Sequence, residues 1–264
     1  MPKNLWSREE LILAFNLYLK LPFGKMHKHT PEIIELANLL GRSPSSIGMR
    51  LGNFASCDPY HQQRGVGGLK GGMNQVQPIW DEFYSNQEAL VYLSEEILAQ
   101  RQHTTIENKY KELLLDLKDI KGETKTREVK TRVNQSVFRD IILANYDSQC
   151  AITGIDIPQL LTASHIIPWS KDEEHRLNPE NGICLSPLYD KAFDRGLISI
   201  STDYKLIYST ELKKKKNTDF YQTQFTPFEN HPMTKPLKYL PRKEFLEYHL
   251  DNIFKNKYRE LNTF

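Results

Sequence analysis

The chain has 264 residues, of which 39% are hydrophobic and 26% are charged, and its formal net charge is +2. This composition is typical of a globular protein with enough apolar residues for one large domain or two ordinary ones. No stretch is long and apolar enough for a membrane span, and the start MPKNLWSREE lacks the apolar core of a signal peptide, so we expect a cytoplasmic protein.

The three cysteines, Cys57, Cys150 and Cys184, are few and scattered. They form no C-x-x-C pair, so the pattern predicts neither a disulfide framework nor a zinc ribbon. The small net charge neither requires nor excludes a nucleic-acid partner, and local clusters must therefore decide.

The N-terminal part predicts helices. In WSREELILAFNLYLKL the apolar residues recur at helical spacing, and Ser7 with Glu10 fits a capping box. TPEIIELANLLGRSPSSIGMRLGNF then predicts two short helices, with Thr30 and Ser43 as N-caps and Gly41 ending the first. Such a pair resembles a helix-turn-helix unit, and an ordinary helical hairpin has the same pattern.

The second helix of this pair is the candidate for reading DNA. We expect Ile47 and Leu51 on its buried side, and short polar side chains with one arginine on its outer face. Such side chains can reach base edges or phosphates in the major groove. The residues assigned to this contact are Ser45, Ser46, Met49, Arg50 and Asn53.

Two less regular stretches follow. Residues 58–77 contain five glycines and predict a loop, either a strap against the DNA backbone or a plain surface loop. PIWDEFYSNQEALVYLSEEILAQR then returns to helical spacing. Residues 101–130 are interpreted as a polar, charged connector, whose end KGETKTREVKTR holds five basic and two acidic residues. That excess suits either a solvated linker or a phosphate contact.

Beyond the connector, QSVFRDIILANYDSQC predicts a helix, and CAITG and LLTASHIIP predict two short strands. NGICLS leads into a short helix, PLYDKAFDR, with Ser186 as its N-cap and Gly196 after its end. Asp190 and Asp194 are four residues apart on that helix, so their carboxylates share one face. They either remain solvated, pair with neighbouring cations, or hold a hard divalent cation.

The histidine of SHII, His165, has two readings as well. A histidine in an aliphatic run is most often a buried core residue. A neutral histidine near a metal-bound phosphodiester can instead take a proton from water and so generate the nucleophile.

These motifs resemble the HNH (ββα-metal) nuclease family, specifically its subgroup of bacterial predicted restriction endonucleases. The resemblance runs from RVNQSVFR through CAITG, ASHIIPW and NGICLSPLYDKAFDRGLISI to LPRKEFLEYHL, about half of the chain. Its first stretch supplies three further candidates for DNA contact: Arg132, Asn134 and Gln135.

The resemblance assigns a role to each matching residue. It implies that His165 is the general base, that Asn181 holds the loop and orients His165, and that Asp190 is a metal ligand. Asp194, one helical turn on, is either a second ligand or an anchor for the adjacent arginine. Many members carry a histidine or aspartate before the base where this chain has Ser164, so the metal sphere would rest on the aspartates, water and a DNA phosphate.

We therefore predict an α+β protein with three parts: an N-terminal helical DNA-recognition domain with a helix-turn-helix-like unit (1–100), the connector (101–130) and a C-terminal HNH nuclease domain (131–264). The expected activity is metal-dependent cleavage of double-stranded DNA by a restriction-type or other defence endonuclease. The expected cofactor is Mg²⁺, with Mn²⁺ or another divalent ion as substitutes. Double-strand cleavage would favour a homodimer. The alternatives are a DNA-binding regulator with an inactive HNH unit and a homing or phage-type nicking endonuclease.

Overall fold

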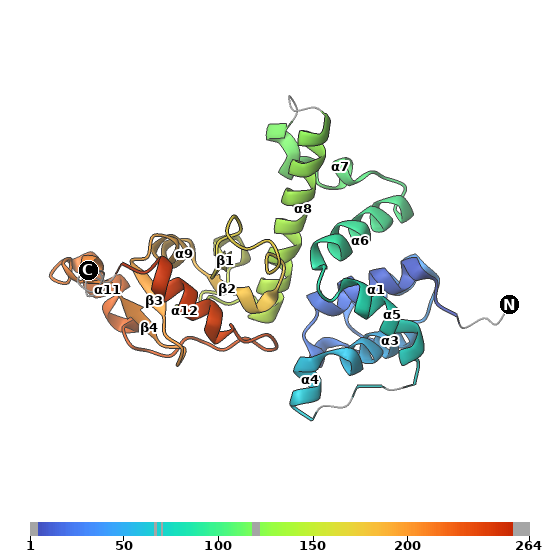
Figure 1. Ribbon diagram of the computed structural model, residues 1–264, viewed down its shortest axis with the longest axis horizontal. Helices are drawn as coiled ribbons and strands as arrows, with labels where there is room; N and C mark the ends of the chain where they lie inside the picture. Colours follow the sequence, from blue (N-terminus) through green and yellow to red (C-terminus); the bar gives the residue numbers. More distant parts are fainter. Residues whose placement is uncertain (1–4, 66–67, 70, 118–121, 256–264) are drawn as a thin grey trace, which may run out of the picture. The chain divides into compact units, whose positions relative to one another are not determined.

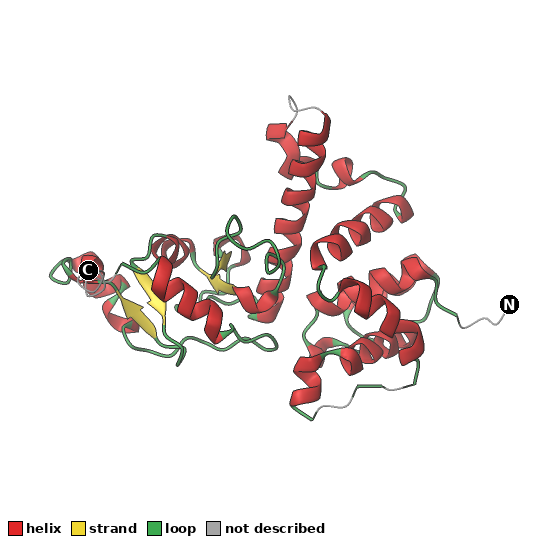
Figure 2. Ribbon diagram, viewed as in Figure 1, coloured by secondary structure: helices red, strands yellow, loops and turns green. Residues whose placement is uncertain are grey.

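The computed structural model describes residues 5–65, 68–69, 71–117 and 122–255, and the chain divides into two compact units, residues 1–141 and 142–264 (Figure 1). The described part of the first unit is helical, and the second combines short helices with two small antiparallel sheets (Figure 2). The predicted α+β class is thus confirmed. None of the helices in the described ranges combines the length and apolar character that a membrane crossing needs.

Helices make up most of the described part of the first unit. They are α1 (Arg8–Lys20), α2 (Pro31–Leu40), α3 (Pro44–Cys57), α4 (Pro59–Gln63), α5 (Met73–Phe83), α6 (Gln87–Arg101), α7 (Ile106–Lys109) and α8 (Gly122–Asn145), whose last turn belongs to the second unit. Short 3₁₀ turns lie at η1 (Phe23–Lys25) and η2 (Lys111–Leu117).

The ends of α1 and α3 are set by the side chains that the sequence indicates. Ser7 Oγ accepts from the backbone N–H of Glu10 at 3.3 Å, and the Glu10 carboxylate accepts from the Ser7 N–H at 2.7 Å, which completes the capping box. Ser43 Oγ accepts from the Ser46 N–H at 3.2 Å at the start of α3. Gly41 ends α2 in the left-handed conformation, with φ of 63°.

Aromatic residues form the centre of the first unit. The ring of Phe15 on α1 stacks on Phe54 of α3 at a centroid distance of 4.7 Å and on Trp80 of α5 at 5.0 Å. Ile47 and Leu51 of α3 are fully buried in the same core, as predicted. These contacts fix α3 against α1 and α5.

The predicted exposure of Arg50 and Asn53 is wrong. Their exposed fractions are 8% and 4%. The Arg50 guanidinium lies over the ring of Trp6 at 4.8 Å, and Asn53 Nδ2 donates to the backbone carbonyls of Leu69 and Gly71 at 2.6 Å each. Both side chains therefore hold neighbouring chain segments against α3 and lie away from the surface.

Two segments predicted as irregular contain helices. The glycine-rich stretch 58–77 includes α4 and the start of α5; its residues 66–67 and 70 lie outside the described residues. The stretch 101–130, predicted as a connector, holds α7, η2 and the start of α8 in its described part. There Ile106, Leu114 and Leu117 form an apolar cluster with α8 residues. The division between the two compact units falls after residue 141, within α8.

The second unit begins with the end of α8 and contains two hairpin-like sheets. Its elements are η3 (Pro158–Leu160), β1 (Thr162–His165), η4 (Pro179–Asn181), β2 (Gly182–Leu185), α9 (Pro187–Asp194), β3 (Ile198–Ile200), β4 (Leu206–Tyr208), α10 (Thr210–Lys213), α11 (Asp219–Gln224), η5 (Thr226–Phe228) and α12 (Lys243–Asn252). β1 pairs with β2, and β3 with β4, both antiparallel.

The expectation that CAITG forms a strand is wrong. Residues 150–154 make a tight turn in which the Cys150 N–H donates to Ile155 O at 2.8 Å and Gly154 has φ of 71°. The partner of β1 is instead the NGICLS stretch that forms β2. Cys57, Cys150 and Cys184 are all buried and form no disulfide with one another.

Gly196, which ends α9, has no room for a side chain. Its φ is 65°, and an added Cβ would lie 2.0 Å from the carbonyl oxygen of Ile253 beyond α12. We expect Gly196→Ala to lower the free energy of unfolding by at least about 2 kcal/mol, because it adds this clash to left-handed strain. Gly154→Ala is the matched control: its φ is 71° with open space around the Cβ position. Urea unfolding of both variants would contradict the clash if their losses were equal.

His249 on α12 is a core histidine. It is 1% exposed, its Nε2–H donates to Phe193 O at 3.1 Å, and Nδ1 accepts from Ser199 Oγ at 2.8 Å. Its ring stacks on Phe193 at 3.7 Å. Burial lowers the pKa of His249 to about 4, and the bond to the Phe193 carbonyl offsets only part of that effect.

This burial predicts a pH-dependent stability. The unfolded chain protonates His249 near pH 6.5 and the folded chain only near pH 4. The contribution is therefore fully present above pH 6.5 and is lost as the pH falls from 6.5 to 4, by on the order of 3 kcal/mol. Urea unfolding across this range should show a smaller pH dependence for His249→Leu than for the parent. His231→Ala, at an exposed histidine, is the control and should leave the pH dependence of the parent unchanged. An equal pH dependence of the free energy of unfolding in all three proteins would contradict the role of His249.

Candidate active site

β1, β2 and α9 bring together the residues predicted to act in catalysis. His165 is the last residue of β1 and pairs with Gly182, while Ser164 pairs with Ile183. α9 begins directly after β2 and contacts both strands. Because Leu185 at the end of β2 pairs with Thr162, α9 begins near the first residue of β1, and Asp190 in its first turn lies near Ser164.

The side chain of His165 is held at one nitrogen. Its Nε2 lies 2.9 Å from the backbone carbonyl oxygen of Arg176. Because a carbonyl only accepts hydrogen bonds, Nε2 carries the proton, and in the neutral ring the lone pair is on Nδ1. Burial lowers the pKa of His165 to about 4, and the bond to the Arg176 carbonyl offsets part of this effect. The ring is consequently neutral at neutral pH.

Two residues that the sequence patterns did not single out frame this histidine. The Trp169 ring meets the His165 ring edge-on, with 5.5 Å between centroids. The Arg176 guanidinium lies 5.2 Å over the Trp169 ring, and its Nε donates to Trp169 O at 2.8 Å. The same arginine thus fixes the tryptophan with its side chain and the histidine with its backbone. Of these two residues, only Trp169 lay in a stretch that the sequence analysis had named, ASHIIPW.

Asn181 fastens the loop between β1 and β2. It is 1% exposed, and its Oδ1 accepts from the Ile167 N–H at 2.8 Å. Its Nδ2 donates to the carbonyls of Ile167 and His175, each at 3.2 Å. The Asn181 carbonyl also accepts from the Ile166 N–H at 3.0 Å. One amide therefore ties both ends of the loop that carries the Arg176 carbonyl.

Asp190 lies half-buried on α9, and Asp194 is exposed one turn further on. Burial raises the pKa of Asp190, which the neighbouring Ser164 and Lys191 partly offset. Burial and the Asp190 carboxylate together raise the pKa of Asp194. The two carboxylates are thus close enough to repel each other, as the predicted shared face requires. No ion pair links Asp194 to Arg195 among the described residues.

Ser164 occupies the position before His165. Its hydroxyl is buried, and among the described residues its Oγ makes no hydrogen bond of normal geometry, although it lies near the Asp190 carboxylate. A buried hydroxyl without a partner is costly in a closed protein interior. Tyr189, directly before Asp190, is 1% exposed and donates its hydroxyl to Gln224 O. It belongs to the core.

The residues predicted to contact DNA fall into two groups. Ser45 and Met49 are exposed on α3 and Ser46 is partly exposed, with Met49 at 56%. In α8, Gln135 is exposed, and Arg132 pairs with Asp116 at 2.6 Å. Asn134, by contrast, is 1% exposed, so its prediction as a surface contact is wrong, as it is for Arg50 and Asn53.

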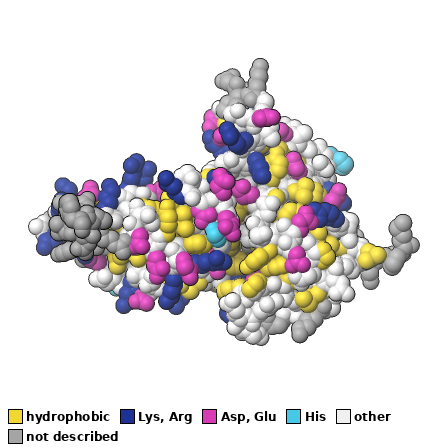
Figure 3. Space-filling model, in the orientation of Figure 1, with side chains coloured by type: hydrophobic (Ala, Val, Ile, Leu, Met, Phe, Trp, Pro, Cys, Tyr) yellow, Lys and Arg dark blue, Asp and Glu magenta, His cyan; other side chains and the backbone are white. Residues whose placement is uncertain are grey.

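Basic and acidic side chains are interspersed over the face of the molecule drawn in Figure 3. This face therefore presents local charged groups of both signs rather than one large basic field.

The chain was then compared with known proteins. Residues 150–201 match the family model of HNH endonucleases, and this segment contains His165, Asn181, Asp190 and Asp194. No match was found among curated proteins. The matched segment covers the 150–154 turn, β1, β2, α9 and β3, which are the elements that build the site. Residues 150–201 are therefore similar to HNH endonucleases, and this similarity supports a nuclease-type hydrolase domain in this part of the chain.

Proposed function

We propose that the chain is a metal-dependent endonuclease that hydrolyses phosphodiester bonds in DNA, and that it serves as a restriction-type or other defence nuclease. The observation that carries the proposal is the state of His165. It is neutral, its Nε2–H is committed to the Arg176 carbonyl, and the lone pair is therefore on Nδ1. A general base for water at neutral pH needs this protonation state.

HNH nucleases generally use a divalent metal, and the residues beside His165 fit one. Burial raises the pKa values of Asp190 and Asp194, and the buried Ser164 hydroxyl lies near the Asp190 carboxylate. A cation at this point would offset the cost of burying the two carboxylates. The described residues gather no group of three histidine, cysteine or acidic side chains around one point. The protein would therefore supply few ligands, the carboxylates of Asp190 and Asp194. Such a set suits Mg²⁺ or Mn²⁺, whose remaining positions are filled by water and phosphate oxygens.

The chemistry then divides among the chain's own groups. When bound, the metal would supply positive charge for the phosphate and for the departing 3′-oxygen. His165 Nδ1 takes a proton from a water molecule as the water oxygen bonds to phosphorus and the bond to the 3′-oxygen breaks. Asn181 and Arg176 keep the imidazole in position during this transfer. The expected products are a 5′-phosphate and a 3′-hydroxyl.

DNA recognition is proposed for the α2–α3 pair, through Ser45, Ser46 and Met49. Their support is exposure on one helix that the core holds rigidly from its other side. Arg132 and Gln135 remain proposed backbone contacts. If each HNH centre cuts one strand, a double-strand break calls for two copies of the chain.

We expect Ser45→Glu to weaken DNA binding about tenfold or more, because it sets a negative charge against the phosphates. Ser45 lies in the first turn of α3, where a carboxylate suits the helix dipole, so folding should be preserved. The matched control is Ile34→Glu on the outer side of α2, where Ile34 is 37% exposed. Fluorescence anisotropy with a labelled duplex measures both. Equal affinities for the two variants would remove α3 from the interface.

The function is tested by incubating the purified chain with Mg²⁺ or Mn²⁺ and with modified and unmodified DNA, followed by sequencing of the ends. Metal-dependent cuts at defined sites support a restriction-type nuclease, and cuts in one strand only support a nicking enzyme. The rival function is a DNA-binding regulator with an inactive HNH unit, which Ser164 favours because it replaces a frequent metal ligand. DNA that is bound but left intact with every divalent ion would establish that rival.

A further inference from the structure

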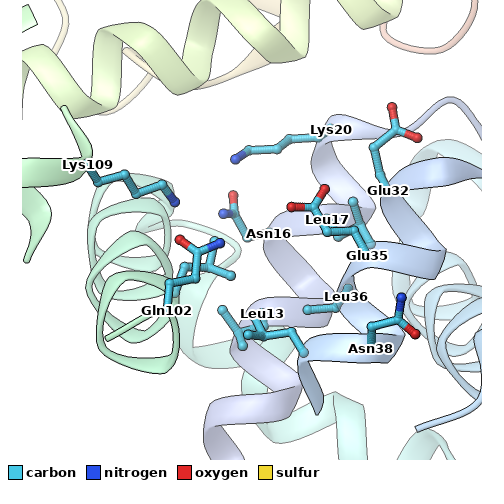
Figure 4. Close-up of a pocket in the computed structure, with 12 residues that line it drawn as sticks. Leu13, Asn16, Leu17, Lys20, Glu32, Glu35, Leu36, Asn38, Gln102 and Lys109 are labelled. Carbon is cyan, nitrogen blue, oxygen red and sulfur yellow. The ribbon is translucent and has the colours of Figure 1, made fainter. Parts of the chain in front are cut away.

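A cavity of about 470 Å³ opens in the first unit, away from the HNH segment in sequence (Figure 4). Leucines of α1, α2 and α6 form its apolar walls, among them Leu13, Leu36 and Leu98. Its volume lies in the range of sites that enclose small ligands, and an apolar lining with a few polar groups is typical of them.

One wall of the cavity is a buried ionic cluster. Glu95 is 1% exposed and accepts from Lys20 Nζ at 2.8 Å, Lys109 Nζ at 2.6 Å and the Tyr110 hydroxyl at 2.8 Å. Burial alone would raise the pKa of Glu95, but the two lysines outweigh it and hold the pKa at about 2. In Figure 4 the two lysine side chains point toward one another above Asn16. Their charges are therefore largely satisfied within the protein.

The side-chain oxygen of Asn16, next to this cluster, has no hydrogen-bond donor within the described residues. Asn16 is 2% exposed, and its Nδ2 donates to Ser94 Oγ at 2.9 Å and Glu95 Oε1 at 3.2 Å. Its Oδ1 is buried at the cavity wall and makes no hydrogen bond within the described ranges. The carboxylate of Glu35 extends toward the same space (Figure 4). The cavity thus offers two hydrogen-bond acceptors: Asn16 Oδ1, which is buried without a donor, and the exposed Glu35 carboxylate.

The charges around the cavity restrict the kind of ligand that can bind there. Lys20 and Lys109 contribute two positive charges, and Glu32, Glu35 and Glu95 contribute three negative ones. A phosphate group would be disfavoured by this balance. The ligand that fits has a flat or apolar body for the leucines, carries no anionic group, and presents N–H donors to Asn16 Oδ1 and Glu35.

We propose that this cavity binds an amino-bearing nucleobase: adenine, cytosine or guanine. Its exocyclic amino group would donate to Asn16 Oδ1 and Glu35, and its heterocycle would lie between the leucine walls. Such a base reaches the protein either as a free nucleoside or extruded from DNA. The free-nucleoside case is independent of the proposed nuclease activity, and the extruded-base case requires DNA binding but no cleavage.

Calorimetry of the full chain with adenosine, cytidine and guanosine tests the proposal directly. At least one should bind, and N6,N6-dimethyladenosine, which keeps the heterocycle but loses the donors, should bind at least about tenfold more weakly than adenosine if adenosine is the ligand. In parallel, a duplex carrying 2-aminopurine should gain fluorescence with the chain if the base is extruded. Absence of both signals overturns the proposal, whether or not the chain cuts DNA.

Three variants test whether the nucleoside or the extruded base binds in this cavity. Leu39→Trp, at a half-buried wall position, should fill the cavity and abolish the response, whereas Ile34→Trp, exposed on the same helix, should leave it intact. Glu35→Ala should weaken binding about tenfold. Because Glu35 is exposed, this change should not affect folding, which melting curves of all three would verify. Binding that persists unchanged in Leu39→Trp and Glu35→Ala places the ligand elsewhere and overturns the assignment.

Discussion

Replacing His165 with alanine is expected to reduce DNA cleavage by at least about 10², while DNA affinity changes little. The reason is that the imidazole acts on the proton of the attacking water, a step that follows binding. The neutral state of His165 and the orientation given by the Arg176 carbonyl support this role. Single-turnover cleavage and anisotropy on the same preparation would measure rate and affinity separately.

The matched control for this change is His231→Ala, an exposed histidine of the same unit. It should cut DNA at the parent rate. A His165→Ala protein that melts normally and still cuts at close to the parent rate would show that another group activates the water.

Replacing Asp190 with asparagine is expected to lower cleavage by about 10² or more and to remove stabilisation by Mg²⁺. Without divalent ions the same change should leave the melting temperature unchanged or raise it. Burial raises the pKa of Asp190, which means that the folded chain carries its negative charge at a cost. An asparagine of the same shape removes that cost, so activity and stability should move in opposite directions.

Asp194→Asn separates the two aspartates. Asp194 is exposed, and its pKa is raised by burial of its surroundings and by Asp190. If Asp194 is a second ligand, Asp194→Asn should raise the Mg²⁺ concentration needed for half-maximal cutting without abolishing the reaction. If Asp190→Asn lowers stability and leaves the Mg²⁺ response intact, Asp190 serves the fold rather than the metal.

Local signals in the sequence were sufficient for much of the helical structure. Capping by Ser7 and Ser43 and the left-handed end at Gly41 depend on residues close in the chain, and all three occur as predicted. Arg50 and Asn53 were misplaced because their partners are distant in sequence. A helical pattern cannot reveal that Trp6 and the chain around Gly71 will cover them.

In the candidate site too, features set by neighbouring residues were predictable and features set by distant contacts were not. The spacing of Asp190 and Asp194 on one helix follows from helical geometry alone. The partner of β1 depended on register between separated segments, so the CAITG turn was mistaken for a strand. Arg176 acts on His165 through its backbone carbonyl, which every residue possesses, and no residue type signals that contact.

Cleavage in water enriched in ¹⁸O tests the central claim most directly. If a water molecule activated at His165 attacks phosphorus and the 3′-oxygen leaves, mass spectrometry of the Mg²⁺-dependent products should find one heavy oxygen on each new 5′-phosphate and none on the 3′-hydroxyl. The His165→Ala protein should yield almost no labelled ends. A 3′-phosphate, an unlabelled 5′-phosphate, or DNA that stays intact with every divalent ion would contradict the account.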